Sequence, residues 1–307
     1  MATAITFPTL QTVNDAISLA YELGQLSVAD SIYKSISFVS KSTGDAEVYP
    51  MFAGTAGLRE WVGDRVVHQL GLETFRLPNK TFEETISVRR EDIEDDRLGL
   101  LTPVAQQLGI DSEIYPDLLI AQLLKNGHNS TIFDGQNFFD VAHPNYSDTG
   151  GPATVANYQA GSSTSWYLID TSKVWRPFIW QERRPFKIIP KFSMTDPSVF
   201  WDNEFVWGVD GRGAAGYGLW HFASRSDAPM NQANLLAAWE TMGQLRRPDG
   251  APMGVGAPRG LKLIVPRALY ATARAYCENP FDPLVTTNLT PNAFQGIATA
   301  VQNDWLN

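Results

Sequence analysis

Apolar residues recur at helical spacing near the start of the chain. Val13, Ile17 and Ala20 lie three or four positions apart, and Ile32 and Ile36 resume the pattern after a glycine. Such spacing predicts one broken amphipathic helix, or two short ones, with a narrow apolar face. We expect this segment to pack on its own fold or to act as an arm that packs on a neighbouring molecule.

Residues 42–91 show a different pattern, because their apolar residues are too thinly spread to fill a compact core. Glycines and a proline occupy the first third, and the runs RVVHQL (65–70) and ETISVRR (84–90) are typical of strands. We predict a long two-stranded ribbon that projects from the body. A two-stranded ribbon is marginal alone and needs another surface to lie on, which is a first indication of an assembling protein.

Residues 90–126 return to helical spacing, with an acid-rich start that suits the positive end of a helix dipole. Thr102 and Pro103 are typical of an N-cap followed by the first helical position. Pro116 predicts a bend or a restart of the helix, because proline lacks the N–H group that a helix interior uses.

The segment 165–224 is rich in aromatic residues and in strand-like runs. Within it, Gly211-Arg212-Gly213 predicts a hairpin connection, and 216–224 predicts a strand that is covered on both faces. Further on, 231–246 predicts a helix with Asn231 as its N-cap. The remaining elements are a strand over 261–266, a helix over 267–279 and a final segment, 296–302, that fits either type.

The stretch STIFDGQNFFDVAHPNYSDTGG (130–151) gathers acidic, imidazole and aromatic side chains around an Asp-Gly pair. Asp134 and Gly135 stand between two apolar runs, which predicts a hairpin whose type I′ turn needs positive φ at both central positions. The alternative is a metal or catalytic site built from Asp134, Asp140 and His143. The loop that includes His143 and Pro144 is rich in turn-forming residues, so we favour the structural interpretation.

Composition narrows the possible function classes. The chain of 307 residues has a net charge of −9, which argues against a surface that wraps nucleic acid but not against a container for it. The single cysteine, Cys277, excludes a disulfide framework and any zinc site with two or more cysteines, and its place in a predicted helix favours a buried thiol. The start of the chain lacks a signal-peptide pattern, and no apolar run is long enough to span a membrane.

Common catalytic motifs are missing from the sequence. GRGAAG (211–216) matches G-x-G-x-x-G in letters, but it lies between predicted strands and not between a strand and a helix. No Walker A, G-x-S-x-G or H-E-x-x-H motif occurs. The charged residues Glu182, Arg183, Arg184 and Lys187 lie in an aromatic, strand-like region. They form either a solvated edge or ion pairs across a subunit contact.

Several phrases occur in order along the chain: WVGDRVVHQL, NKTFEETISVRREDIEDDRLG, FDGQNFFDVAHPN, FIWQERRPFK, WDNEFVWGVDGRGAAGYGLW and LKLIVPRALYATAR. From about Trp61 to about Trp305, this ordered set resembles the Mu-like phage major head subunit, the gpT family of major capsid proteins. The resemblance implies an α+β protein with the HK97-type major capsid fold, and it favours a strand for 296–302. It also implies no enzymatic activity, no cofactor and no metal.

The resemblance divides the chain into five parts. These are an N-terminal arm (1–47), an extended loop (48–88), a peripheral domain with a spine helix (89–130 and 164–230), an axial domain (131–163 and 231–285) and a C-terminal segment (286–307) that returns to the sheet. The implied assembly interface includes Trp61, Arg65, Phe75, Phe82, Glu182, Arg183, Arg184 and Lys187. The hairpin with Asp134, Gly135, His143 and Pro144 falls in the axial domain.

The implied function is that of a structural head protein of a tailed double-stranded DNA phage or prophage. Copies of the chain would form the hexamers and pentamers of an icosahedral shell, which encloses the genome without sequence-specific binding. Portal and scaffold proteins are expected partners during assembly, a decoration protein is a further candidate, and no membrane partner is expected. The chain would be made in the host bacterial cytoplasm and end in the virion. The alternatives are an encapsulin-like compartment with the same fold and, less favoured, a metal-dependent hydrolase.

Overall fold

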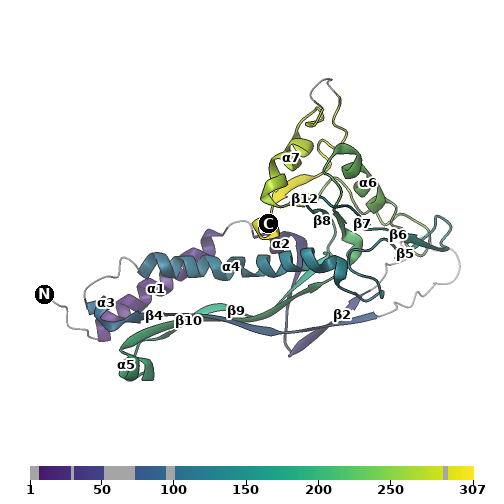
Figure 1. The fold of residues 1–307 in the computed structure, drawn as a ribbon. Helices are drawn as coiled ribbons and strands as arrows, with labels where there is room; N and C mark the ends of the chain where they lie inside the picture. Colours follow the sequence, from purple (N-terminus) through teal and green to yellow (C-terminus); the bar gives the residue numbers. More distant parts are fainter. Residues whose placement is uncertain (1–6, 29–30, 52–72, 95–100, 286–289) are drawn as a thin grey trace.

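The structure, a computed structural model, describes residues 7–28, 31–51, 73–94, 101–285 and 290–307. These residues form an elongated part, built on a long four-stranded sheet, and a triangular part, built on a five-stranded sheet (Figure 1). Two further pairs of strands, a ribbon and a short hairpin, belong to neither sheet.

The long sheet has the strand order β1-β9-β10-β4. Its strands are β1 (Ser37–Lys41), β9 (Phe178–Lys191), β10 (Glu204–Tyr217) and β4 (Lys80–Arg89). β10 pairs antiparallel with both of its neighbours, whereas β1 runs parallel to β9. Phe205, Trp207 and Val209 are buried at alternate positions of β10, as expected for a strand with one covered face. The helices α1 (Phe7–Ser27) and α4 (Leu101–Asn126) cover that face (Figure 1).

The two covering helices lie with their backbones in contact. A Cβ atom on Gly24 of α1 would stand 2.1 Å from the carbonyl oxygen of Gln106, and one on Gly109 of α4 would stand 2.1 Å from that of Tyr21. Glycine is therefore required at both positions. The sequence predicts one broken helix or two short ones at the start of the chain. The structure has two helices, α1 and α2 (Ile32–Ile36), and α1 packs on α4 of its own chain.

The predicted restart of the helix at Pro116 is wrong, because α4 runs through this residue. Proline inside a helix costs about 3 kcal/mol. Buried residues recur every three or four positions on both sides of it, including Leu108, Ile120 and Leu124. Packing of this continuous apolar face outweighs the lost backbone hydrogen bond. The helix also begins at Leu101, so the predicted cap lies inside it.

The predicted hairpin connection at Gly211-Arg212-Gly213 is also wrong, since these residues lie inside β10. The glycines allow close packing: a Cβ atom on Gly211 would stand 2.6 Å from the Phe186 ring, and one on Gly213 would stand 2.5 Å from the Gln181 carbonyl oxygen. The register with β9 shifts on both sides of Arg212, as at a β-bulge.

The triangular part contains the five-stranded sheet, in the order β13-β12-β8-β11-β7. Its strands are β13 (Thr299–Gln302), β12 (Leu261–Val265), β8 (Trp166–Asp170), β11 (Ala223–Ser226) and β7 (Tyr158–Gln159). The central strand β8 is buried at all five positions. The helices α6 (Gln232–Gly243) and α7 (Arg267–Glu278) pack on this sheet (Figure 1).

Most predictions for this part are confirmed. Both helices and the strand over 261–265 occur, and the Asn231 side chain caps α6 by accepting a hydrogen bond from the Asn234 N–H, at 2.9 Å. β13 confirms a strand within 296–302. The predicted single strand over 216–224 is wrong, because a 3₁₀ turn, Trp220–Phe222, separates β10 from β11.

The smaller elements lie at the margins of the two sheets. β2 (Ala46–Met51) and β3 (Glu73–Pro78) form the ribbon, and β5 (His143–Tyr146) and β6 (Pro152–Val155) form the short hairpin. The helices α3 (Arg90–Glu94) and α5 (Pro197–Asp202) lie at the far end of the long sheet, and 3₁₀ turns occur at Gly127–Asn129 and Asp304–Leu306 (Figure 1). Among the residues described, no helix combines the length and apolar character needed to cross a bilayer.

Candidate assembly surfaces

The β2–β3 ribbon is the first candidate assembly surface. Its strands pair antiparallel over six residues each, and Val48 in β2 is 56% exposed. Trp61 and Arg65, two of the predicted interface residues, fall in 52–72 and so lie outside the described residues. Their role in assembly stays a prediction.

The run ETISVRR (84–90), predicted as a ribbon strand, lies instead mainly in β4 of the long sheet. Ile86 and Val88 pack against the apolar side chains of α1 and β10. Alternating apolar and polar residues are expected both in an edge strand of a covered sheet and in a strand of a ribbon. The local pattern therefore could not distinguish between these two positions for the strand.

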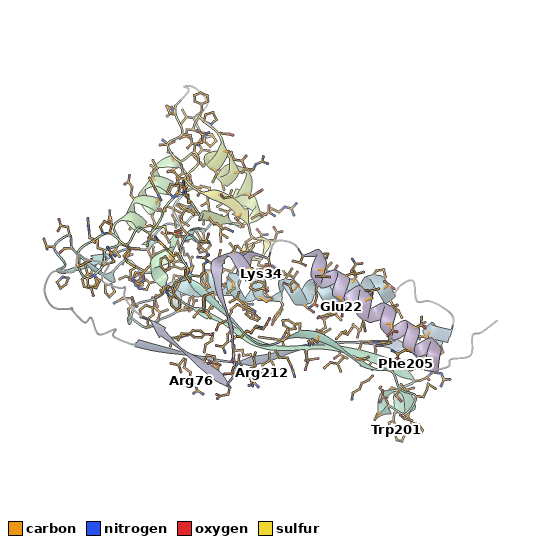
Figure 2. The ribbon with its side chains drawn as sticks, turned by 180° about the vertical axis from the view of Figure 1, so that it is seen from behind. Glu22, Lys34, Arg76, Trp201, Phe205 and Arg212 are labelled. Atoms are coloured by element: carbon orange, nitrogen blue, oxygen red, sulfur yellow. The ribbon has the colours of Figure 1, made fainter. Side chains whose placement is uncertain are left out.

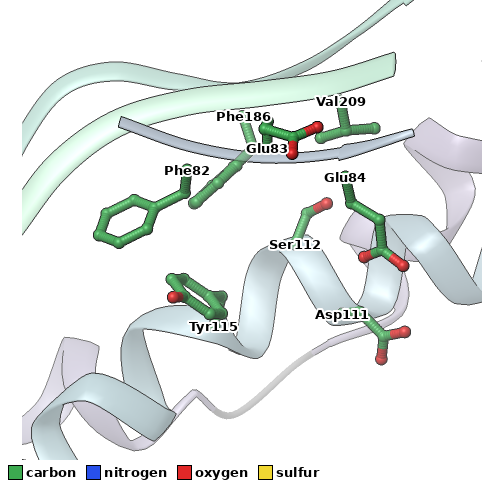
Figure 3. Close-up of a pocket in the computed structure, with 8 residues that line it drawn as sticks. All are labelled: Phe82, Glu83, Glu84, Asp111, Ser112, Tyr115, Phe186 and Val209. Atoms are coloured by element: carbon green, nitrogen blue, oxygen red, sulfur yellow. The ribbon is translucent and has the colours of Figure 1, made fainter. Parts of the chain in front are cut away.

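Phe75 and Phe82, two further interface candidates, both pack partly on their own chain. Phe75 in β3 is half-buried against the main core. Figure 3 shows Phe82 in β4 facing Tyr115 of α4, with ring centroids 4.9 Å apart, and Phe186 lies 6.4 Å away. These rings line a hollow of about 170 Å³ between β4 and α4, which Asp111 also borders. Neither phenylalanine is fully covered, so a contact with a neighbour stays a prediction.

The charged residues of QERRPFK lie on β9, with different partners. Arg183 donates from Nη1 to the Ser42 carbonyl oxygen at 3.0 Å, and Arg184 pairs with Asp210 at 2.5 Å. Glu182 is half-buried, whereas Lys187 is exposed. The charges of Arg183 and Arg184 are thus engaged within the chain, and an intersubunit role for these four residues stays a prediction.

The Asp-Gly turn lies where the sequence places it, but its type differs. Thr131 bridges to Asn137, and the Gly135 N–H donates to the Ile132 carbonyl oxygen at 3.1 Å. Gly135 has φ +79°, whereas Asp134 has negative φ. The predicted type I′ turn is therefore wrong, and the pattern matches a turn followed by a left-handed glycine. The carboxylate of Asp134 caps it by accepting from the Gln136 N–H at 3.1 Å.

A buried cluster of aromatic rings stands behind this turn. His143 is fully buried, and its Nδ1 lies 2.7 Å from Oδ2 of Asp134. The indole of Trp220 stacks on both His143 and His221, with centroids 3.9 Å apart in each case. Among the described residues, Nε2 of His143 and Nδ1 of His221 have no hydrogen-bond partner. Pro144, in β5, is exposed.

This environment shifts two protonation equilibria. Burial, followed by the charge of His143, lowers the pKa of His221 to about 3, while Asp134 acts in the opposite direction. Burial alone would raise the pKa of Asp134, but hydrogen bonds from His143 and from the Gln136 N–H outweigh it, so this pKa is lowered.

The structure brings together only part of the alternative metal site. Asp134 and His143 meet, but the carboxylate of Asp140 accepts hydrogen bonds from the N–H groups of Val141 and Ala142. No group of three or more histidine, cysteine, aspartate or glutamate side chains within the described ranges could hold a metal ion. The Asp134–His143 pair therefore serves the turn.

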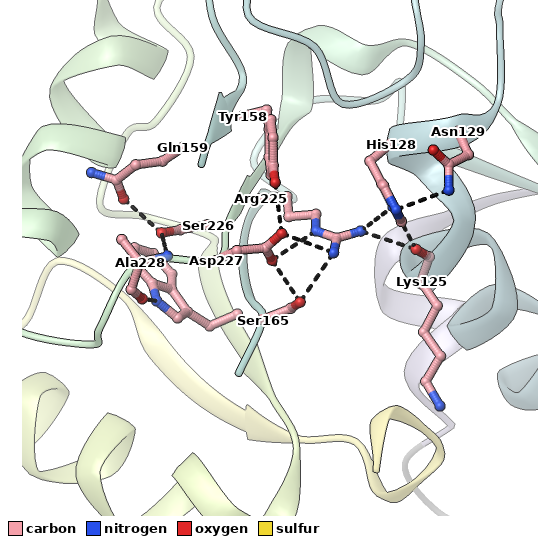
Figure 4. A network of polar contacts seen from close by, with 11 residues as sticks. Lys125, His128, Asn129, Tyr158, Gln159, Ser165, Arg225, Ser226, Asp227 and Ala228 are labelled. Atoms are coloured by element: carbon pink, nitrogen blue, oxygen red, sulfur yellow. Dashed lines mark hydrogen bonds and ion pairs between the residues drawn. The ribbon is translucent and has the colours of Figure 1, made fainter. Parts of the chain in front are cut away.

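A polar joint connects α4 to the five-stranded sheet (Figure 4). The guanidinium of Arg225 in β11 pairs with Asp227, at 3.0 Å, and donates from Nη1 to the Lys125 carbonyl oxygen at the end of α4, at 2.9 Å. Tyr158 and Ser165 donate to the same aspartate, at 2.8 and 2.6 Å. Although burial alone would raise the pKa of Asp227, these hydrogen bonds lower it. The buried ion pair of Arg225 and Asp227 thus links the elongated part, through α4, to the triangular part.

The second candidate surface is the tip formed by α5. Phe200 and Trp201 are 72% and 78% exposed and pack edge to face, while Val199 anchors the helix in the core (Figure 2). Two adjacent exposed aromatic side chains are unusual on a monomer and indicate a contact site. This run lies in 165–224, whose strand-like pattern does not predict a helix. The Asp196-Pro197 pair before it is a helix-start signal that could have revealed the helix.

Capsid structures of bacteriophage JBD30 share this architecture. The chain of the procapsid of bacteriophage JBD30 is 30% identical and superposes with a TM-score of 0.81, over 98% of this chain and 100% of that one. The capsid of bacteriophage JBD30 decorated with minor capsid protein trimers gives a TM-score of 0.74 at 24% identity, over 92% and 93% of the chains. The protein is therefore a capsid subunit with the HK97-type fold.

The sequence comparisons define the family. The model of the Mu-like prophage major head subunit gpT matches residues 10–306. The major capsid protein of Escherichia phage Mu is 34% identical over 271 residues, which cover 83% of this chain and 89% of that protein. The chain belongs to the Mu-like gpT family of major head subunits. It is a structural major capsid protein and not an enzyme.

Proposed function

We propose that copies of this chain assemble as hexamers and pentamers, and that the β2–β3 ribbon of each copy lies across a neighbour. The observation that carries this proposal is the ribbon itself. It contains two strands, is paired with neither main sheet, and presents exposed apolar residues such as Val48. One face of the ribbon packs on the long sheet through Tyr49 and Leu77, and the exposed face of such a two-stranded ribbon would be stabilised by a neighbouring surface.

The interface that results is heterologous, because a ribbon on one copy must meet a different surface on the next. Heterologous contacts form a ring when the rotation from one copy to the next returns to the first copy after a whole number of copies. The α5 tip, with Phe200 and Trp201, is the second proposed contact. The charges Glu182, Arg183, Arg184 and Lys187 on β9 form part of the surface that faces a neighbour.

The proposed division of the chain follows the two bodies of the structure only in part, because β8 and β11 of the five-stranded sheet fall within the peripheral range. The peripheral domain (89–130 and 164–230) includes α4 as its spine and most of the long sheet, and the axial domain (131–163 and 231–285) includes α6, α7 and the Asp-Gly turn. Residues 1–47 form the N-terminal arm and 48–88 the extended loop. The segment 286–307 returns to the five-stranded sheet as β13.

The proposed partners follow from a closed shell around DNA. The net charge of −9 suits a wall that encloses double-stranded DNA and does not bind it tightly. Portal and scaffold proteins would act during assembly, and a decoration protein is proposed by analogy with the decorated capsid of bacteriophage JBD30. We propose synthesis in the host bacterial cytoplasm followed by incorporation into the virion.

Shortening the ribbon tests the central proposal. Replacement of residues 48–76 by a short Gly-Ser turn removes Val48 and most of β2 and β3, keeps the pair of Glu47 and Leu77, and leaves β4 paired in the long sheet. We expect this variant to fold, at a lower unfolding temperature because the buried ring of Tyr49 is lost, and to form no closed shells in negative-stain electron microscopy. Normal shells from the shortened variant would refute the ribbon's role.

A matched pair of substitutions tests the α5 tip. Trp201→Ser removes a 78% exposed aromatic side chain from the proposed contact, whereas Val174→Ser removes an 80% exposed apolar side chain from the β8–β9 connection. Both subunits should retain their stability, because neither side chain is in the core. Only Trp201→Ser should raise the subunit concentration needed for assembly, and equal effects of both would argue against a specific contact at α5.

A further inference from the structure

We propose that Gln181 is a positioning residue for shell assembly: its side chain fixes the direction in which the β2–β3 ribbon leaves the long sheet. The inference rests on the proposed function, since it assumes that the ribbon contacts a neighbour. It adds a residue, in the middle of β9, that controls the geometry of that contact.

Gln181 is fully buried, yet its side chain is a polar amide. Its Oε1 accepts a hydrogen bond from the Tyr49 hydroxyl at 2.9 Å. Its Nε2 donates to Oδ1 of Asn79 at 2.7 Å and to the Leu77 carbonyl oxygen at 3.2 Å. One side chain of the sheet therefore holds β2 through Tyr49, β3 through Leu77, and the residue between β3 and β4 through Asn79.

These hydrogen bonds hold the ribbon in one orientation relative to the long sheet. Rotation of the ribbon away from Gln181 would break these hydrogen bonds and leave buried donors and acceptors without partners, which is energetically unfavourable. A small rotation that breaks only some of the bonds is also unfavourable, because the groups that lose their partners stay buried away from water. The network therefore favours one orientation of the ribbon over a continuous range.

The segment that leads into β2 is tied to the same place. Asn79 donates from Nδ2 to the Ser42 hydroxyl at 2.8 Å and to the Gly44 carbonyl oxygen at 3.0 Å. The Ser42 N–H donates to the Glu182 carbonyl oxygen at 2.8 Å, next to Gln181 in β9. Both ends of the ribbon are thus bound to one point of the long sheet.

Apolar packing provides a second, independent restraint. A Cβ atom on Gly216 of β10 would stand 2.9 Å from Leu77 and 3.4 Å from the Phe75 ring. Glycine at this position lets β3 lie directly on the sheet, with Tyr49 and Leu77 buried. Hydrogen bonds from β9 and close packing on β10 therefore act on the same ribbon from two neighbouring strands.

A change in the orientation of the ribbon is carried to its contact with a neighbour. Gln181 bonds Tyr49, the fourth of the six residues of β2, so roughly 7 Å of β2, at about 3.4 Å per residue, lies beyond that bond. A rotation of about 10° there would displace the end of β2 by about 1 Å. The displaced side chains would change the angle at which two subunits meet in a shell.

Gln181→Met tests the inference, because methionine keeps the length of the side chain and removes all three hydrogen bonds. We expect folded subunits in which hydrogen exchange of the amides in 46–51 and 73–78 accelerates about tenfold. We also expect particles whose diameters spread beyond the single parental size in cryo-electron microscopy. Gln159→Met is the matched control, since Gln159 is a half-buried, hydrogen-bonded glutamine of the five-stranded sheet, away from the ribbon.

Parental exchange rates in both strands and a single parental diameter for Gln181→Met would overturn the inference. The same broadened sizes from Gln159→Met would overturn it as well, because loss of stability alone would then explain the effect. If Gln181→Met fails to fold, Tyr49→Phe removes only the bond to β2, and parental exchange of β2 together with a parental diameter would again refute the role. Normal shells from the shortened ribbon would instead refute the proposed function.

Discussion

His221 makes the folding stability of the subunit depend on pH. A histidine has an ordinary pKa of about 6.5 in an unfolded chain, whereas burial lowers the pKa of His221 in the folded subunit to about 3. The folded state therefore excludes a proton that the unfolded state binds. Stability from this residue is complete above about pH 6.5 and declines as the pH falls toward 3.

The size of the effect follows from the two pKa values. Between pH 7 and pH 5, an unfolded histidine takes up most of one proton while the folded one takes up almost none, which costs about 2 kcal/mol of folding free energy. The lowered pKa of Asp134, which faces the same cluster, acts only below the ordinary aspartate pKa of about 3.9. Asp134 therefore contributes little between pH 7 and pH 5, and a variant without His221 is needed to separate its contribution from those of the other histidines.

His221→Phe removes the titrating group and keeps a ring beside Trp220. Urea unfolding of unassembled subunits, followed by circular dichroism, gives the free energy of unfolding at pH 7 and pH 5. We expect the parent to lose about 2 kcal/mol more than the variant over this interval. Equal losses in the two proteins would show that His221 is protonated in the fold, and the reasoning from burial would fail.

Three further predictions concern other parts of the subunit. Gly109→Ala should destabilise the subunit by about 2 kcal/mol and expose α1 to limited proteolysis, because the added Cβ would stand 2.1 Å from the Tyr21 carbonyl oxygen. Arg225→Ala should cost about 3–5 kcal/mol in urea unfolding, because it leaves the carboxylate of Asp227 buried and unpaired, and Arg225→Lys should recover only part of that loss. Cys277 should react with a thiol reagent at pH 8 about 100-fold more slowly than an unfolded control, because burial, aided by Glu278, raises its pKa to about 11.

Elements stabilised by local signals were predictable from the sequence. Asn231 predicts the start of α6 because it is a good N-cap residue, and the Asp134-Gly135 pair predicts a turn. Both features depend only on residues that are neighbours in the chain. The family resemblance supplied the architecture as a whole, which periodicity alone did not.

The errors share a physical cause. A glycine in sequence looks the same whether it serves a turn or a close approach, and the roles of Gly211 and Gly213 depend on Phe186 and Gln181 in the adjacent strand. The hydrogen bond between Tyr49 and Gln181 joins residues 132 positions apart. Gln181 stands beside charged residues in the sequence, so no local pattern shows that it is buried. It is buried because the distant β2–β3 ribbon covers it.

The exposed indole of Trp201 has a practical consequence. Trp166, Trp207 and Trp220 are already buried in the free subunit, whereas Trp201 is 78% exposed at the α5 tip. If a neighbour covers that tip, the environment of one chromophore changes while those three stay constant. Intrinsic fluorescence would then follow shell growth in real time without an attached dye, and Trp201→Phe would show how much of the change comes from the α5 tip and how much from other tryptophans such as Trp61.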